Sequence, residues 1–179
     1  MIFWSFVDNN FFPDEIIILG IDPGLAITGW GIVHVQGQSL TAVGFGQIKT
    51  TTKETRSARL GKIASQIRSV IKEYSPTQVA VEQQFVAKNV RSAMAIGEAR
   101  AAAMIAAADF ELPVYEFAPK AIKEAVAGFG NATKEQVQQM VFMQLEISEV
   151  NESFDISDAF AVALTRFADA NLELAMVRK

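Results

Sequence analysis

The spacing of apolar residues changes near residue 50, and this change limits the folds that the chain can adopt. Three short apolar runs before that point predict strands at Ile16–Ile21, Ile27–Val35 and Leu40–Ile48. After it, apolar residues recur mostly at helical spacing, and only Val79–Glu82 and Val114–Phe117 fit strands. Three consecutive strands predict an antiparallel meander, and the later strands alternate with helices as βαβ units. We therefore expect an α/β fold, a five-stranded mixed sheet with helices on both faces.

Helical spacing accounts for most of the remaining chain. The expected helices cover residues 60–74, 91–108, 120–127, 134–145 and 155–167. Thr133 and Gln136 fit a capping box at the start of the fourth of these helices. Because the chain has no repeat, low-complexity tract or long linker, we expect one domain over residues 16–170. An N-terminal extension (1–15) and a C-terminal tail (171–179) flank it.

Residue usage restricts the chemistry of any site. The chain has no cysteine, which excludes disulfides, thiolate zinc sites, iron–sulfur clusters and thiol catalysis. His34 is the only histidine, which excludes a two-histidine metal motif. A bound metal would need oxygen ligands, and this favours Mg²⁺ or Mn²⁺. The formal net charge of −4, taken alone, argues mildly against nucleic acid as a ligand.

No segment of the sequence is typical of a membrane span or of a secretion signal. The most apolar helical stretch, Ala101–Ala108, lies between Arg100 and Asp109 and is far shorter than about 20 residues. The first 15 residues are aromatic and acidic and contain no basic residue. We therefore expect a cytoplasmic protein without a membrane segment.

Four carboxylates stand where strands end or a helix begins. Asp22 follows the first strand, Glu82 ends the fourth, and Asp155 and Asp158 lie three residues apart near the start of the last helix. A lone carboxylate at the end of a buried strand is costly to desolvate unless something pairs it, and a divalent cation can do so. Together the four predict an oxygen-ligated metal site, which can hold two cations about 4 Å apart.

Three of these acids also have a simpler interpretation. Asp22 precedes Pro-Gly and fits a turn residue, and Glu82 fits a solvated strand end. Asp155 fits an acidic residue favoured by the dipole of a helix N-terminus. The metal hypothesis depends on all four acids occurring together.

Several blocks of the sequence are similar to one known family. They are ILGIDPG (18–24), TGWGIV (28–33), VAVEQQFVAKNVRSAMAIGEAR (79–100), LPVYEFAPKAIKEAVAGFGNATKEQV (112–137) and DISDAFAVALTR (155–166). In this order they resemble the RuvC-type Holliday junction resolvases of the ribonuclease H-like superfamily. The resemblance runs from about Ile16 to Arg166 and implies a ribonuclease H-like fold.

The resemblance implies a role for each of the four acids. Asp22, Glu82, Asp155 and Asp158 match the family's four metal ligands, which implies a catalytic site with Mg²⁺, replaceable by Mn²⁺, and two ions per subunit. Hydrolysis of a phosphodiester needs an in-line water and neutralised charge at both oxygens, which paired Mg²⁺ ions provide.

The resemblance also implies DNA contacts. Phe85 matches an aromatic residue inserted at the junction crossover, and Lys123 and Lys134 match residues that contact phosphates. Lys88 and Arg91 follow Phe85 and suit phosphate contacts beside a base stacked on its ring. Without the resemblance, Phe85 fits a core residue and the lysines fit solvated helix positions.

The activity implied is resolution of Holliday junctions in DNA recombination and repair. A homodimer makes paired symmetric nicks that leave 5′-phosphate and 3′-hydroxyl ends, and its partner is a branch-migration motor of the RuvA–RuvB type. Three alternatives stay open: a related nuclease of structured ribosomal RNA precursors, a nucleotide-binding lobe of the actin and sugar-kinase type, and a non-catalytic junction-binding module. The second would need two such lobes.

The charges are unevenly distributed along the chain. Between Lys49 and Lys72 there are seven basic residues and one acid, Glu54, whereas Glu146 to Asp158 holds five acids and no base. This asymmetry permits a basic DNA-facing surface on an acidic chain.

Overall fold

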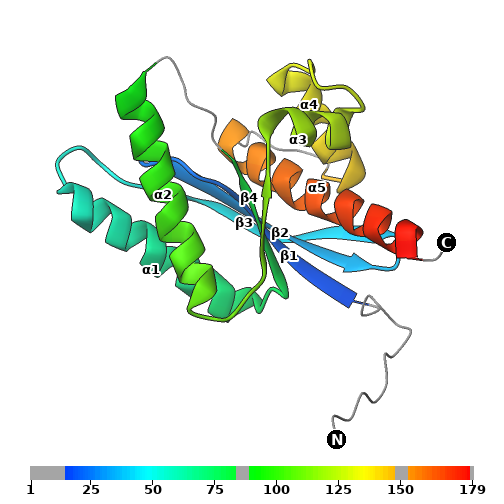
Figure 1. Ribbon diagram of the computed structural model, residues 1–179, viewed down its shortest axis with the longest axis horizontal. Helices are drawn as coiled ribbons and strands as arrows, with labels where there is room; N and C mark the ends of the chain where they lie inside the picture. Colours follow the sequence, from blue (N-terminus) through cyan, green and yellow to red (C-terminus); the bar gives the residue numbers. More distant parts are fainter. Residues whose placement is uncertain (1–14, 84–88, 148–152, 178–179) are drawn as a thin grey trace, which may run out of the picture.

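A computed structural model of the chain describes residues 15–83, 89–147 and 153–177, and in them one mixed sheet lies between two layers of helices (Figure 1). The strands lie side by side in the order β3-β2-β1-β4-β5. β1 pairs with β2, and β2 with β3, in antiparallel fashion, whereas β4 is parallel to both β1 and β5. The five-stranded mixed sheet is therefore confirmed. The strands are β1 (Glu15–Asp22), β2 (Ile27–Gln36), β3 (Ser39–Lys49), β4 (Gln78–Glu82) and β5 (Val114–Phe117).

Alternating side chains of the central strands divide the core into two layers. Ile18 and Val33 face the layer formed by α3, α4 and α5, and Leu19 and Ile32 face α1 and α2. All four side chains are fully buried. Helices therefore cover both faces, as the sequence predicts. The helices are α1 (Arg56–Tyr74), α2 (Val90–Ala108), α3 (Pro119–Ala127), α4 (Lys134–Gln144) and α5 (Phe154–Val177).

The ends of the helices follow local signals. The Thr55 side chain accepts a hydrogen bond from the backbone N–H of Ala58, so α1 begins at Arg56, earlier than the expected residue 60. The capping box of Thr133 and Gln136 is confirmed at the start of α4.

Helix α5 is longer than the hydrophobic spacing predicts. It continues ten residues beyond 167, through most of the segment expected to be a C-terminal tail. The cause lies at Arg166, which is buried and forms ion pairs with Asp169 at 2.9 Å and Glu173 at 3.1 Å. These pairs join successive turns and stabilise the extended helix.

Helix α5 lies directly on β1 and β2 because two glycines leave room for its backbone. A Cβ atom on Gly20 would overlap the carbonyl oxygen of Ala159 and lie 2.8 Å from the nitrogen of Ala163. A Cβ atom on Gly29 would overlap the carbonyl oxygen of Asp155. This close approach sets the height of the first turns of α5 above the sheet, and those turns carry Asp155 and Asp158.

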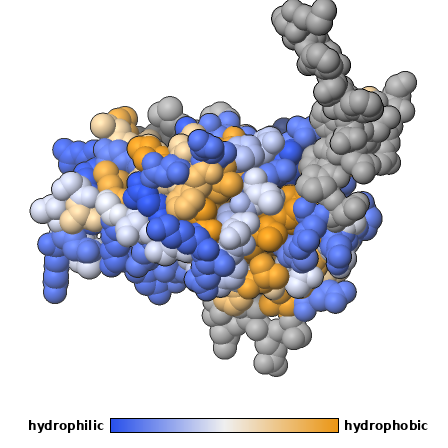
Figure 2. Space-filling view, turned by 90° about the horizontal axis from the view of Figure 1, so that it is seen from below, coloured by the Kyte–Doolittle hydropathy of each residue, from blue (hydrophilic) through white to orange (hydrophobic). Residues whose placement is uncertain are grey.

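The surface of the described chain is not uniformly polar. Large hydrophobic side chains such as Phe45, Met94 and Leu172 are exposed, and Figure 2 shows hydrophobic patches among hydrophilic side chains on one face. Of the helices in the described segments, none has the length and apolar composition needed to cross a membrane.

Candidate functional site

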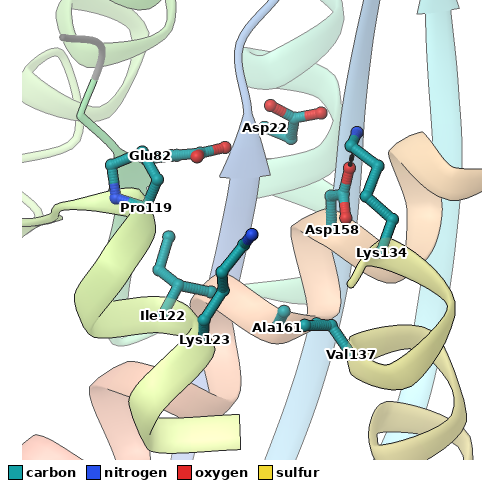
Figure 3. Close-up of a pocket in the computed structure, with 9 residues that line it drawn as sticks. All are labelled: Asp22, Glu82, Pro119, Ile122, Lys123, Lys134, Val137, Asp158 and Ala161. Atoms are coloured by element: carbon teal, nitrogen blue, oxygen red, sulfur yellow. Dashed lines mark hydrogen bonds and ion pairs between the residues drawn. The ribbon is translucent and has the colours of Figure 1, made fainter. Parts of the chain in front are cut away.

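Three of the four predicted acids line one cavity, which lies at the carboxyl ends of two interior strands of the sheet. Asp22 is the last residue of β1 and Glu82 the last residue of β4. Because these neighbouring strands are parallel, their carboxyl ends lie side by side. Asp158, on α5, faces the same cavity of about 210 Å³. Figure 3 shows the side chains of Asp22, Glu82 and Asp158 around the same cavity.

Burial and mutual repulsion perturb this cluster. Burial first, and then the charges of Glu82 and Asp158, together raise the pKa of Asp22 from its ordinary 3.8 to about 8. Burial also raises the pKa of Glu82, although the hydrogen bond with Asp22 opposes this. The pKa of Asp158 is raised by burial too, against a hydrogen bond from Lys134. All three carboxylates therefore resist ionisation in the same cavity. A cation bound there would be favourable, because its positive charge stabilises their ionised form.

Two lysines complete the cavity. Lys134 Nζ donates a hydrogen bond to Asp158 Oδ2 at 2.9 Å and lies 5.9 Å from the centre of the Phe154 ring. That hydrogen bond raises the pKa of Lys134. Lys123, on α3, also lines the cavity, and Figure 3 shows its ammonium directed into it. Both lysines therefore lie next to the carboxylates, at a place suited to a phosphate group.

Asp155 faces a neighbouring groove instead of the cavity. Its Oδ2 accepts a hydrogen bond of 2.9 Å from the side-chain amide of Gln47, which also donates to the hydroxyl of Ser153. The charge of Asp155 still contributes to the raised pKa of Asp22, so the fourth acid lies within electrostatic reach of the other three.

Sequence reasoning did not single out Gln47. Phe45, two residues earlier on β3, contacts Phe160 of α5, with ring centres 5.8 Å apart. Gln47 shares that face of the strand and therefore also points toward α5. The alternation along β3 indicates that Phe45 and Gln47 share one face of the strand. Nothing in the sequence indicates which helix covers that face.

The donor set suits an oxygen-binding divalent cation. The carboxylates of Asp22, Glu82 and Asp158 converge on one cavity, and Asp155 borders it. In residues 15–83, 89–147 and 153–177, no three acidic or histidine side chains already stand close enough together to enclose an ion. Lys134 donates a hydrogen bond to Oδ2 of Asp158, and Gln47 donates one to Oδ2 of Asp155, so each carboxylate has a second oxygen beside these bonds.

The other predicted DNA contacts are only partly described. Phe85 and Lys88 lie outside the described residues. Arg91 lies in the first turn of α2 and lines the groove that contains Asp155. The DNA-binding roles of all three residues, and of Lys123 and Lys134, stay predictions.

We expect Asp22→Asn to stabilise the metal-free protein at neutral and alkaline pH. The raised pKa means that the folded chain keeps a proton that the unfolded chain has already lost, so stability falls as pH rises from about 4 to about 8. An amide removes this penalty. Thermal unfolding in chelator should show a melting temperature about 4–8 °C above wild type at pH 8, corresponding to about 2 kcal/mol, and little difference at pH 4.

The matched control is Asp109→Asn, at the end of α2, where the carboxylate is exposed and paired with Arg68. It should not reproduce the gain at pH 8. A lower melting temperature for Asp22→Asn throughout this pH range would contradict the assignment of Asp22 as a buried, repelled carboxylate.

Comparison with known proteins identifies the relatives of this chain. The family model described as "Crossover junction endodeoxyribonuclease RuvC" matches residues 18–166. The chain is 43% identical to the protein of that name from Heliobacterium modesticaldum, over 83% of this chain and 92% of the relative. It is 46% identical to the one from Dehalococcoides mccartyi, over 82% of this chain and 88% of the relative.

Solved structures agree with these sequence matches. The structure is similar to T. thermophilus RuvC in complex with a Holliday junction substrate, with a TM-score of 0.84 and 33% identity, covering 89% of this chain and 97% of that one. The yeast mitochondrial Holliday junction resolvase Ydc2, at 13% identity, covers 96% of this chain and 87% of its own, with a TM-score of 0.64. At that identity it shows the fold alone.

Proposed function

Since this chain belongs to the RuvC family of crossover junction endodeoxyribonucleases, we propose that the cavity formed by Asp22, Glu82 and Asp158 is its catalytic centre for resolving Holliday junctions. The observation that carries this assignment is the convergence of three carboxylates and two lysines at the ends of β1 and β4. All of these residues, and Asp155, lie within the matched range of 18–166.

Asp22, Glu82 and Asp158, joined by Asp155, would hold the metal of this metal-dependent nuclease. We propose Mg²⁺ as that metal, with Mn²⁺ able to replace it and two ions bound per subunit. The bound metal supplies activated water and charge neutralisation in phosphodiester hydrolysis. The raised pKa of Asp22 would return to an acidic value beside a cation, because the cation favours the ionised form.

The remaining residues of the cavity would bind and orient the phosphate. Lys123 and Lys134 bring positive charge to one side of the carboxylates, where a phosphate oxygen is attracted. The Lys134–Asp158 hydrogen bond holds both side chains at the rim of the cavity before DNA arrives. Ile122, Val137 and Ala161 form an apolar wall that excludes water from the far side.

We propose that the protein acts as a homodimer, with the exposed face of α2 as its contact surface. Val90, Met94 and Ile105 are each more than half exposed. Gly97 and Ala101 are also exposed, and steps of three or four residues place all five on one side of the helix. An apolar helix face of this kind is typical of a protein–protein contact.

Two further proposals rest on family membership. The partner at the junction is a branch-migration motor of the RuvA–RuvB type, and the protein works in the cytoplasm, where chromosomal DNA is recombined and repaired.

The test is cleavage of a mobile four-way DNA junction by the purified chain. With Mg²⁺ or Mn²⁺ we expect paired nicks at symmetry-related positions, and ligase should seal them because they carry 5′-phosphates. A structured RNA at equal concentration should stay intact. Unpaired nicks would contradict the dimer, and preferential RNA cleavage would favour the ribosomal RNA nuclease. Binding without nicks in either metal would favour a non-catalytic module.

A further inference from the structure

A second depression borders the catalytic cavity, and arginines line it. This arginine groove, of about 550 Å³, lies between the β1–β2 turn and the first turns of α1 and α2. Arg56, Arg59 and Arg91 line it together with Asp155. Asp158, one helical turn from Asp155 on α5, lines the catalytic cavity. A chain lying along these two turns of α5 would therefore pass from one depression into the other.

Arg59 is already oriented by the protein. Its Nε donates to Thr50 Oγ1 at 2.7 Å, and Nη2 donates to the carbonyl oxygen of Leu25 at 3.2 Å. These two bonds use only part of the five-donor guanidinium and fix its plane beside the β1–β2 turn. A guanidinium held in this way loses little conformational entropy when it binds a phosphate.

The other two arginines come from two different helices. Arg56 begins α1, and its Nε donates to the carboxylate of Glu98, while both side chains stay substantially exposed. Arg91 lies in the first turn of α2, where the Asn89 side chain accepts its backbone N–H. The groove thus holds three guanidinium groups, with Glu98 and Asp155 as the acidic side chains beside them.

The helix axes add to this positive charge. Both α1 and α2 begin at the groove, so the positive ends of two helix dipoles face it. Thr55 and Asn89 already cap the first backbone N–H groups, and the arginine side chains therefore provide the donors for a ligand.

We propose that the arginine groove binds the DNA backbone at phosphodiesters that flank the scissile one. Guanidinium groups match phosphate oxygens in geometry and charge. The groove and the catalytic cavity are neighbours along α5, because Asp155 lines the groove and Asp158 lines the cavity. Apart from its three arginines, the polar side chains that line the groove are Ser92 and Asp155. Contacts to the phosphates position the strand and carry no sequence information directly. This inference rests on the proposed function, because it deepens the substrate contacts of that same site.

The test is the salt dependence of junction binding by Arg56→Gln and Arg91→Gln, measured with Ca²⁺ in place of Mg²⁺. Each variant should raise the dissociation constant about five- to tenfold at moderate salt. Each should also reduce the slope of log K against log [salt] by about 0.9, the effect of one lost phosphate contact. A merely structural arginine would lower the melting temperature without changing this slope.

The matched control is Lys72→Gln, which removes the same charge from α1. Lys72 is exposed in the last turn of that helix, about 24 Å along the axis from Arg56. It should leave the slope at the wild-type value.

The outcomes separate this inference from the proposed function. A wild-type chain that neither binds nor cuts the junction would overturn the proposed function. A wild-type chain that cuts it, with slopes for both arginine variants equal to that of Lys72→Gln, would overturn the arginine groove alone.

Discussion

Replacing Glu82 with Gln is expected to reduce junction cleavage by about 10²- to 10³-fold while the junction is still bound. The substitution keeps the size of the side chain but removes one negative charge from a cavity that already contains Asp22 and Asp158. A divalent cation that stabilises the transition state contributes several kcal/mol, and each 1.36 kcal/mol lost lowers the rate about tenfold. The measurement is single-turnover cleavage with Mg²⁺, beside a binding assay.

Asp158→Asn should give the same loss of cleavage, because its carboxylate lines the same cavity. Glu124→Gln is the matched control, since this carboxylate lies on α3 and pairs only with exposed Lys120 at 3.7 Å among the described residues. It should cleave at the wild-type rate. If Glu82→Gln or Asp158→Asn also cleaves at that rate, the ligand assignment is wrong.

Gly20→Ala is expected to destabilise the fold by about 3 kcal/mol, because the added Cβ meets the backbone of α5. The atoms it would overlap, Ala159 O and Ala163 N, belong to a helix backbone and cannot rotate away as a flexible side chain can. Thermal unfolding should show a melting temperature lower by roughly 6–12 °C. The overlap can be relieved only if α5 moves away from β1. Because α5 carries Asp158, this movement would displace a carboxylate of the cavity, and cleavage by the folded protein should also fall.

Gly61→Ala makes the same chemical change in the middle of α1, where a Cβ would meet no atom within 4 Å. There alanine should stabilise the protein by about 1 kcal/mol, because glycine is a poor helix former. Equal melting temperatures for Gly20→Ala and the wild type would show that α5 does not depend on this close approach.

Much of the fold could be predicted from periodicity. The strands begin and end within two residues of their expected bounds, because alternation and helical spacing report burial directly. The limits of α1 and α5 were less predictable, because they depend on a cap at Thr55 and on the ion pairs of Arg166. The spacing of hydrophobic residues does not report side-chain caps or ion pairs.

The candidate site was predictable in part. Asp22 and Glu82 end strands that proved to be parallel neighbours, so their convergence follows from topology. Asp155 and Asp158 lie three residues apart on one helix, and this separation leaves them about 60° apart around the axis. The structure directs one into the cavity and the other toward Gln47 and the arginine groove.

The sequence by itself limited the chemistry that a site in this protein can use, since a chain without cysteine and with one histidine would have to hold a metal through oxygen ligands. It also determined the order of strands and helices, because local periodicity encodes both. Only the tertiary structure decided which charges meet. Arg56 and Arg59 lie in a basic stretch of α1, but the groove also needs Arg91, more than 30 positions away along the chain. Such a meeting depends on how α1 and α2 pack against the sheet, and packing is a property of the whole folded chain.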